Sequence, residues 1–427
     1  MDAFVLLGSF FVLMILGVPV AYALGMASLI GALWINLPVD GVMIQIASGV
    51  NKFSLLAIPF FVLAGAIMAE GGMARRLVAF AGVLVGFMRG GLALVNILAS
   101  TFFGALSGSS VADTASIGSV LIPEMEKKGY PRDFSTAVTC SGSIQATLIP
   151  PSHNAVIYSL AAGGSVSVAG LFLAGVFPGL LLGATIAALC LIIARKRNFP
   201  AGERIPLKKA LKICVEALWG LMTIFIILGG ILGGVFTATE SASIAVLWAF
   251  FVTMFIYRDY KWTDLPKLMH RTVKTVTIVM ILIGFAASFG YLMTLMQIPA
   301  TVTAFFVGLS DSKVVILLMI NIMLLLLGTL MDMAPLILIL TPILLPVVTS
   351  LGVDPIHFGM IMIVNLGIGL ITPPVGTILF VGSAVSKLPM GVITMAMRPF
   401  FVALVIVLML VTYIPAISLW LPRAFGV

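Results

Sequence analysis

Long apolar stretches alternate with short polar segments along the whole chain. The stretches long enough to cross a hydrocarbon core of about 30 Å occupy residues 4–35, 53–70, 166–194, 215–235, 241–257, 275–297 and 394–421. Two basic segments, 195–212 and 258–274, separate groups of them. The pattern predicts an all-α polytopic membrane protein. Because two crossings lie between the basic segments, both should face one side, which the positive-inside rule makes cytosolic.

Four further segments are apolar at their ends and interrupted in the middle. Residues 90–127 contain the run SGSS, residues 313–350 contain GTLMDMAP, residues 131–162 contain IPPSHN and residues 355–385 contain TPPVGT. A proline pair inside a helix removes backbone donors and breaks the helix. Non-helical backbone at membrane depth is tolerated only where it lines a protein cavity. We therefore expect re-entrant hairpins at 90–127 and 313–350, and broken helices at 131–162 and 355–385.

These interruptions recur at an offset of 223 residues, which predicts an internal repeat. The matching positions are Pro123 with Pro346, Gly129 with Gly352, and the pair Pro150-Pro151 with Pro373-Pro374. A chance register of prolines is the alternative explanation. With the basic segments cytosolic, we expect the two copies to have inverted topology, and paired interrupted segments are the best sequence pointer to a transporter's binding site.

The repeat predicts the organisation of the chain. Residues 1–52 form an N-terminal scaffold helix and loop. Residues 53–194 form the first repeat, with an arm at about 73–88, and residues 275–427 form the second repeat, with an arm at about 299–311. Residues 195–274 carry the basic loops and a two-span scaffold insert.

The hairpin tips and helix breaks are the candidate binding region. Residues 107–110 would face the break at 147–154, and residues 328–332 would face the break at 367–376. The spacing from tip to break is 41 residues in both copies, from Ser109 to Pro150 and from Asp332 to Pro373. Helix N-termini carry partial positive charge and suit a carboxylate, whereas helix C-termini and unwound carbonyls suit sodium.

Asp332 is the strongest single candidate. A charge at mid-membrane costs about 3 kcal/mol or more, so it marks function by default; the alternative is a helix-cap aspartate. Other polar residues also have a structural alternative. Asp113 and Glu240 could cap helices, His153 could make a structural hydrogen bond, and the serines of the first tip could serve helix packing.

Composition narrows the function. The chain has 427 residues, of which 61% are hydrophobic and 9% charged, and this excludes a water-soluble domain. The net charge of +8 lies in short loops, which argues for orienting charges and against nucleic-acid binding. No nucleotide-binding or hydrolase motif is present in the sequence. Transport would then depend on an ion gradient. The first 35 residues lack a basic start, so we expect a retained helix.

The motifs resemble a known family. The stretches GALSGSSVADTASIGSVLIPEMEKKGYPRDFSTAV, IPPSHN, GTLMDMAPLILILTPILLPV and LGIGLITPPVGTILF look like the large membrane subunit of tripartite ATP-independent periplasmic (TRAP) transporters. The resemblance covers nearly the whole chain. It implies a sodium-coupled elevator transporter of the bacterial inner membrane, with sodium ions as the bound cofactor. Family substrates are carboxylates, including C4-dicarboxylates and sialic acid.

The resemblance also implies partners and site residues. The partners are a small four-helix membrane subunit, which we expect to be a separate chain, and a periplasmic substrate-binding protein. The implied sodium ligands are Ser107, Gly142, Thr147, Pro150, Gly328, Gly369 and Thr372. The implied substrate region is Ser109, Ser110, Ser152 and Asp332.

Two other functions stay open at this point. One is a stand-alone sodium–carboxylate symporter that needs no binding protein. The other is an intramembrane enzyme acting on lipid-linked substrates, which would require paired acids or a His–acid pair at one depth; the sequence does not assemble one.

Overall fold

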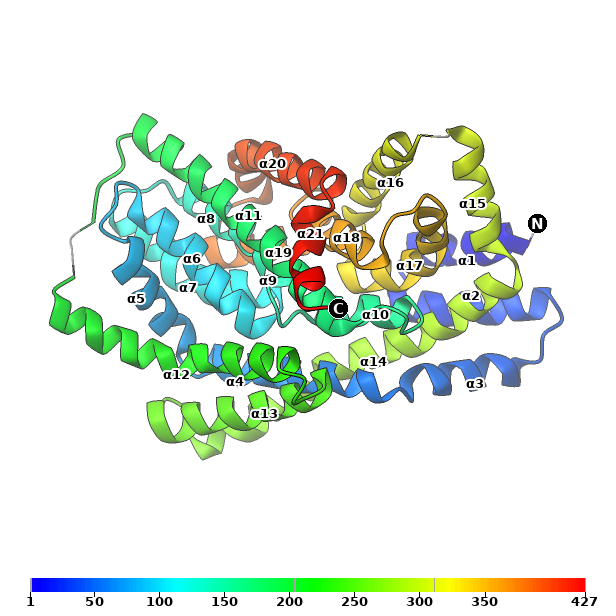
Figure 1. Cartoon of the computed structure of the whole chain (residues 1–427), viewed down its shortest axis with the longest axis horizontal. Coiled ribbons are helices and arrows are strands. Elements are labelled where there is room, and N and C mark those ends of the chain that lie inside the picture. The colour runs from blue at the N-terminus through cyan, green and yellow to red at the C-terminus, as the bar shows by residue number, and fades with distance from the viewer. Residues whose placement is uncertain (1, 203–204, 311, 427) are drawn as a thin grey trace.

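The computed structural model describes residues 2–202, 205–310 and 312–426, which fold into helices joined by short turns (Figure 1). No β-strand occurs within these ranges. In chain order the helices are α1 (Asp2–Ile15), α2 (Val20–Trp34), α3 (Val39–Val50), η1 (Phe53–Leu56), α4 (Ala57–Glu70), α5 (Met73–Val85), α6 (Gly91–Ser107), α7 (Ser110–Lys127), α8 (Arg132–Gly142), α9 (Gln145–Leu148), α10 (His153–Ala161), α11 (Val168–Lys196), α12 (Leu207–Leu232), α13 (Ala238–Phe251), η2 (Val252–Tyr257), η3 (Trp262–Asp264), α14 (Leu265–Leu295), α15 (Ile298–Leu309), α16 (Lys313–Gly328), α17 (Met333–Ser350), α18 (Pro355–Gly369), α19 (Thr377–Ser386), α20 (Met390–Tyr413) and α21 (Ala416–Ala424).

Seven of the described helices are long and apolar enough to cross a membrane. Six of them overlap the apolar stretches expected from the sequence. The seventh is α17, which the sequence pattern assigns to one half of a hairpin. The fold is therefore all-helical and polytopic, as predicted.

The N-terminal segment differs from the expectation of one scaffold helix followed by a loop. Residues 4–35 form two helices, α1 and α2, and residues 39–50 form a third helix, α3. Gly17 has a φ of +85°, a conformation that ends a helix readily only at glycine. Pro19 then immediately precedes α2. The apolar pattern runs through this turn, so hydrophobicity alone hides the break.

The long helices that follow build one layer. Helix α14 packs against α2, α3 and α4, and α13 packs against α4 and α12. These helices run along the lower part of Figure 1, and the helices of the interrupted segments lie above them. Helix α5 contacts both α4 and α6, and α15 contacts both α14 and α17, so each joins the two groups.

The interrupted segments form helix pairs. Helix α6 turns into α7 at Gly108 and Ser109, and α16 turns into α17 over residues 329–332. Two further interruptions separate α9 from α10, at Pro150-Pro151, and α18 from α19, at Pro373-Pro374. Each of these proline pairs is joined by a cis peptide bond. The inverted relation between the two halves stays a prediction.

The expected arms at about 73–88 and 299–311 coincide with α5 and α15. Residue 311 lies outside the described residues. So do residues 1 and 427, at the ends of the expected scaffold segment and second repeat, and residues 203–204 of the expected insert.

The expected boundary between the insert and the second repeat falls at 274/275, inside the continuous helix α14, and most of the expected basic loop 258–274 is helical. The polar residues at 264–274 mask the start of the helix in a search for apolar runs. Because they belong to α14, they are held in a fixed direction relative to the rest of the layer.

Glycines allow the second hairpin to press against its broken helix. A Cβ atom on Gly369 would lie 2.7 Å from the backbone Cα and carbonyl carbon of Gly328, and a Cβ on Gly328 would lie 3.2 Å from the Cα of Gly369. Helix ends approach this closely only where side chains are absent.

We predict that Gly369→Ala lowers the melting temperature of the purified protein, because the added methyl group meets backbone that cannot move cheaply. Overpacking of this kind costs about 1–3 kcal/mol. Gly391→Ala is the matched control, since a Cβ there meets nothing within 4 Å. Equal melting temperatures for the two variants would contradict the close approach.

Candidate functional site

The first hairpin tip lies against the first helix break. A Cβ on Gly108 would lie 2.7 Å from the carbonyl oxygen of Pro151 and 3.4 Å from Nδ1 of His153. One turn earlier, a Cβ on Gly104 would lie 2.6 Å from the Cα of Ala146. The tip therefore contacts backbone on both sides of the proline pair, as the shared spacing in the sequence suggests.

The second tip lies against the second break in the same way. The backbone N–H of Val375 donates a hydrogen bond of 3.1 Å to the carbonyl of Thr329. Thr372 closes the end of α18, since its hydroxyl donates to the carbonyl of Ile368 at 2.7 Å. The hairpin tip thus accepts a hydrogen bond from one of the backbone N–H groups that the break leaves without a helical partner.

The two hairpins meet at a cavity of about 390 Å³. Its wall includes the first residues of three helices: Ser110 to Ala112 of α7, His153 and Asn154 of α10, and Met333 and Ala334 of α17. The remainder of the wall comes from α4, the middle of α10, the first half of α14, Leu370 and three residues of the hairpin tips, Ser107, Ser109 and Asp332.

Three helix N-termini at one cavity create a positive electrostatic potential. Each N-terminus leaves backbone N–H groups without helical partners and carries about half an elementary charge. At the first of them, Ser109 is the N-cap, and its hydroxyl accepts a hydrogen bond of 3.3 Å from the N–H of Ala112. Such an arrangement binds anions without requiring a dedicated cationic side chain.

The residues predicted to contact substrate separate into two groups. Ser109, Ser110 and Asp332 line the cavity. Ser152 does not. It is buried, and its hydroxyl donates to the carbonyl of Thr147 at 2.6 Å, across the helix break. The structure therefore gives Ser152 a role in holding the break, and three of the four predicted residues share one wall.

The predicted sodium ligands lie at helix C-terminal ends and breaks. Ser107 ends α6, Gly142 ends α8, Gly328 ends α16 and Gly369 ends α18. Thr147 and Pro150 lie in the first break, where the Thr147 hydroxyl donates to the carbonyl of Ile144 at 2.8 Å. Thr372 lies in the second break. Carbonyl oxygens accumulate at such ends, and hard cations prefer oxygen ligands.

Two of the residues with structural alternatives have clear surroundings. Glu240 completes a capping box with Thr237 at the start of α13, which accounts for it as a cap. Asp113 is not a cap. It is fully buried one turn into α7, where the Ser100 side chain is its hydrogen-bonding neighbour.

Two further candidates line the cavity. His153 does so beside Gly108. Asp332 occupies the N-cap position of α17 without a side-chain capping hydrogen bond, and its side chain faces the cavity. Asp332 therefore occupies the position of a helix cap, but its side chain does not make the hydrogen bond of one.

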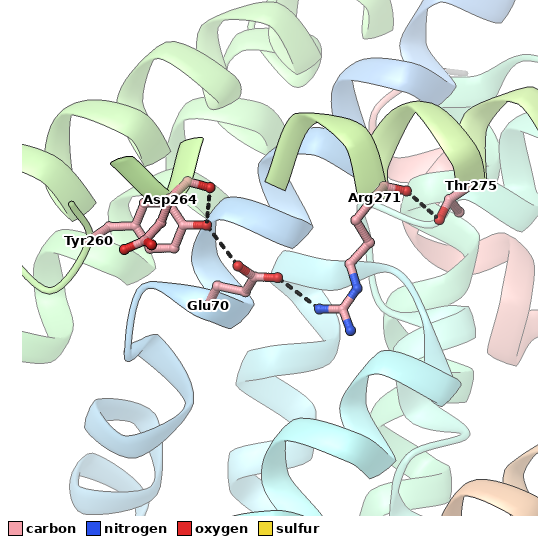
Figure 2. Close-up of polar contacts among 5 residues, drawn as sticks. All are labelled: Glu70, Tyr260, Asp264, Arg271 and Thr275. Carbon is pink, nitrogen blue, oxygen red and sulfur yellow. Dashed lines mark hydrogen bonds and ion pairs between the residues drawn. The ribbon is translucent and has the colours of Figure 1, made fainter. Parts of the chain in front are cut away.

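The sequence reasoning missed one wall of the cavity. Arg271, Thr272 and Thr275 come from α14, and Glu70 of α4 binds Arg271 with an Oε1–Nη1 distance of 2.8 Å (Figure 2). Arg271, Thr275 and Val279 follow one another at four-residue spacing, which places them on one helix face. This spacing was a usable signal, but it requires knowing that the helix begins at residue 265.

Comparison with known proteins identifies the family. Residues 7–417 match the family model described as "Tripartite ATP-independent periplasmic transporter, DctM component". The chain belongs to this family. It is 46% identical over 376 residues to the C4-dicarboxylate TRAP transporter large permease DctM of Pseudomonas aeruginosa, covering 88% of each chain. It is 38% identical over 381 residues to the sialic acid TRAP transporter large permease SiaM of Vibrio cholerae, covering 89% of each.

The fold also resembles a solved transporter. The YdaH transporter of Alcanivorax borkumensis aligns with a TM-score of 0.62 at 17% identity, over 87% of this chain and 86% of that one. At this identity the likeness concerns the fold alone. Together with the family match, it makes the chain a multi-pass inner-membrane permease of the TRAP type for organic acids.

We predict that Ser109→Ala in this TRAP permease lowers organic-acid uptake, because it removes a hydroxyl from the cavity wall and the cap of α7. Loss of such a cap costs about 1 kcal/mol. Ser119→Ala is the control on the same helix, where the residue is exposed and its hydroxyl donates to the carbonyl of Ser116. Uptake in vesicles, normalised to the amount of inserted protein, is the measurement, and equal uptake by the two variants would contradict the assignment.

Proposed function

We propose that this chain imports a small organic acid together with sodium, as the membrane-spanning permease of a complete TRAP transporter. The observation that carries the proposal is the convergence of the N-termini of α7, α10 and α17 on one cavity. Their N–H groups suit a carboxylate, and the hydroxyls of Ser109 and Ser110 add neutral donors.

Sodium coupling is supported by the helix C-termini that lie at the tips and breaks. Helices α6, α16 and α18 direct their C-terminal carbonyls at the breaks, where partial negative charge gathers. The residues we assign to sodium are those that the family resemblance implies: Ser107, Gly142, Thr147 and Pro150 for the first tip, and Gly328, Gly369 and Thr372 for the second. Sodium bound there would order the tips before the acid enters the cavity.

An elevator-type movement is supported by the separation of the helices into two groups. Helices α5 and α15, which belong to neither hairpin, link the hairpins to the long helices, and α6 and α17 also pack directly on α4 and α14. A second cavity of about 310 Å³ lies farther along α14, between Ile283 and Thr294. It also includes residues 160 and 161 at the far end of α10. A hairpin group that moves along α14 would exchange one cavity for the other.

The partners follow from the family. A DctM component acts with a small membrane subunit and a periplasmic binding protein, and we propose both for this chain. The substrate is a C4-dicarboxylate or a sugar acid, because the relatives named above are named for a C4-dicarboxylate and for sialic acid.

Reconstitution tests the proposal as a whole. Proteoliposomes that contain the permease and its small subunit receive labelled succinate or N-acetylneuraminate, with and without the binding protein and an inward sodium gradient. We expect uptake of one acid only when both are present. Uptake without the binding protein would favour a stand-alone symporter, and uptake indifferent to sodium would refute the coupling.

We predict that Asp332→Asn abolishes most of this uptake while membrane insertion stays normal, because the neutral amide no longer accepts charge-assisted hydrogen bonds in the cavity. The loss should be about tenfold or more. Asp354→Asn is the matched control: Asp354 is also an N-cap, but it caps α18 through Ile356 and His357, and asparagine caps equally well. Normal uptake by Asp332→Asn would remove Asp332 from the site.

A further inference from the structure

One cationic side chain faces the proposed anion cavity. Of the described residues that line it, Arg271 alone carries a permanent positive charge, and Asp332 alone carries a carboxylate. The Arg271 side chain is 76% exposed, so its guanidinium is hydrated and open to a solute. It projects from α14, which faces the hairpin tips across the cavity.

The guanidinium is only partly occupied. Within the described residues, its one side-chain contact is the bond from Nη1 to Oε1 of Glu70, at 2.8 Å. A guanidinium offers five N–H donors in a planar fork. The Nε and Nη2 edge is therefore free to receive a carboxylate in a two-point contact.

Glu70 is held in place independently of Arg271. The hydroxyl of Tyr260 lies 2.8 Å from Oε2 of Glu70 and 3.1 Å from the carbonyl of Asp264, and both acceptors share its single proton (Figure 2). Burial, together with the hydrogen bond and the charge of Glu70, raises the pKa of Tyr260 to about 12, so the hydroxyl stays a donor at neutral pH. Glu70 therefore remains beside Arg271 whether or not the cavity holds an anion.

From this arrangement we infer that Arg271 is a substrate-binding residue whose anion site is contested by Glu70. An acid carboxylate entering the cavity takes the free edge of the guanidinium. Glu70 weakens that contact by supplying a competing negative charge at the same group. The acid is therefore held weakly near the N-terminal end of α14. This weak hold favours its release toward that end of the helix. This inference rests on the proposed function, since it assigns the acid's carboxylate a partner in the same cavity.

The two members of the pair make opposite predictions. Arg271→Gln removes a charge-assisted hydrogen bond and should raise the Kd for the acid about tenfold or more. Glu70→Gln removes the competitor and should lower the Kd several-fold. A merely structural ion pair predicts the same sign for both variants, because either substitution breaks it.

The experiment titrates the permease, purified in detergent with its small subunit and saturating sodium, with succinate and in parallel with N-acetylneuraminate. Binding is followed as the rise in melting temperature, and the temperature without acid reports folding. Lys274→Gln is the matched control: it lies on the same helix, is exposed and does not line the cavity. Arg271→Lys, which keeps the charge and loses the fork, should give an intermediate Kd.

The results separate the inference from the proposed function. Opposite shifts for Arg271→Gln and Glu70→Gln, with Lys274→Gln unchanged, support it. Unchanged binding in Arg271→Gln, or weakened binding in both variants, would overturn it while leaving the transport function intact. A wild-type permease that binds neither acid and transports neither would remove the proposed function and this inference together.

Discussion

Everything at the centre of this molecule follows from backbone that cannot remain unpaired inside a membrane. Helix is interrupted in four segments of the chain, and each interruption frees N–H and C=O groups that lipid could not satisfy. The structure places each hairpin tip against a helix break, so that some of these N–H and C=O groups are hydrogen-bonded within the protein. The hydrogen bond from Val375 to Thr329 and the one from Ser152 to Thr147 are two examples. What is left unpaired is available to ions and solute.

The breaks also determine where the partial charges of the helix termini lie. Helix N-termini and C-termini at the breaks carry opposite partial charges, and the cavity is lined by three N-termini together with Ser107 at the C-terminus of α6. Opposite partial charges this close together would let a cation and an anion bind at neighbouring places. The pairing of tips with breaks also explains the small residues at the contacts, because Gly108, Gly328 and Gly369 allow backbones to approach at distances that any side chain would prevent.

The long helices contribute differently. They bring a positively charged side chain to the cavity, where the hairpins bring helix N-termini, hydroxyls and the Asp332 carboxylate. Arg271 reaches the cavity from α14, outside the hairpins, and Glu70 of α4 binds it from behind the cavity wall. A solute in the cavity therefore lies between the hairpin wall, with its helix N-termini and Asp332, and the α14 wall with Arg271, and its binding free energy depends on both walls.

The sequence by itself determined the all-helical membrane fold, the four interruptions and the pairing of each tip with its break. These features depend on local chemistry: apolar length, proline pairs and glycine. It could not determine that Ser152 turns away from the cavity, because the direction of a side chain within a break depends on the acceptor that packing supplies, here the carbonyl of Thr147. Nor could it place Arg271, which looks like an orienting charge in a basic loop until α14 is seen to begin at Leu265. The meeting of the two hairpins at one cavity, and the Glu70–Arg271 pair across 201 positions of sequence, were decided only by tertiary packing, because nothing local to either residue specifies a partner so distant along the chain.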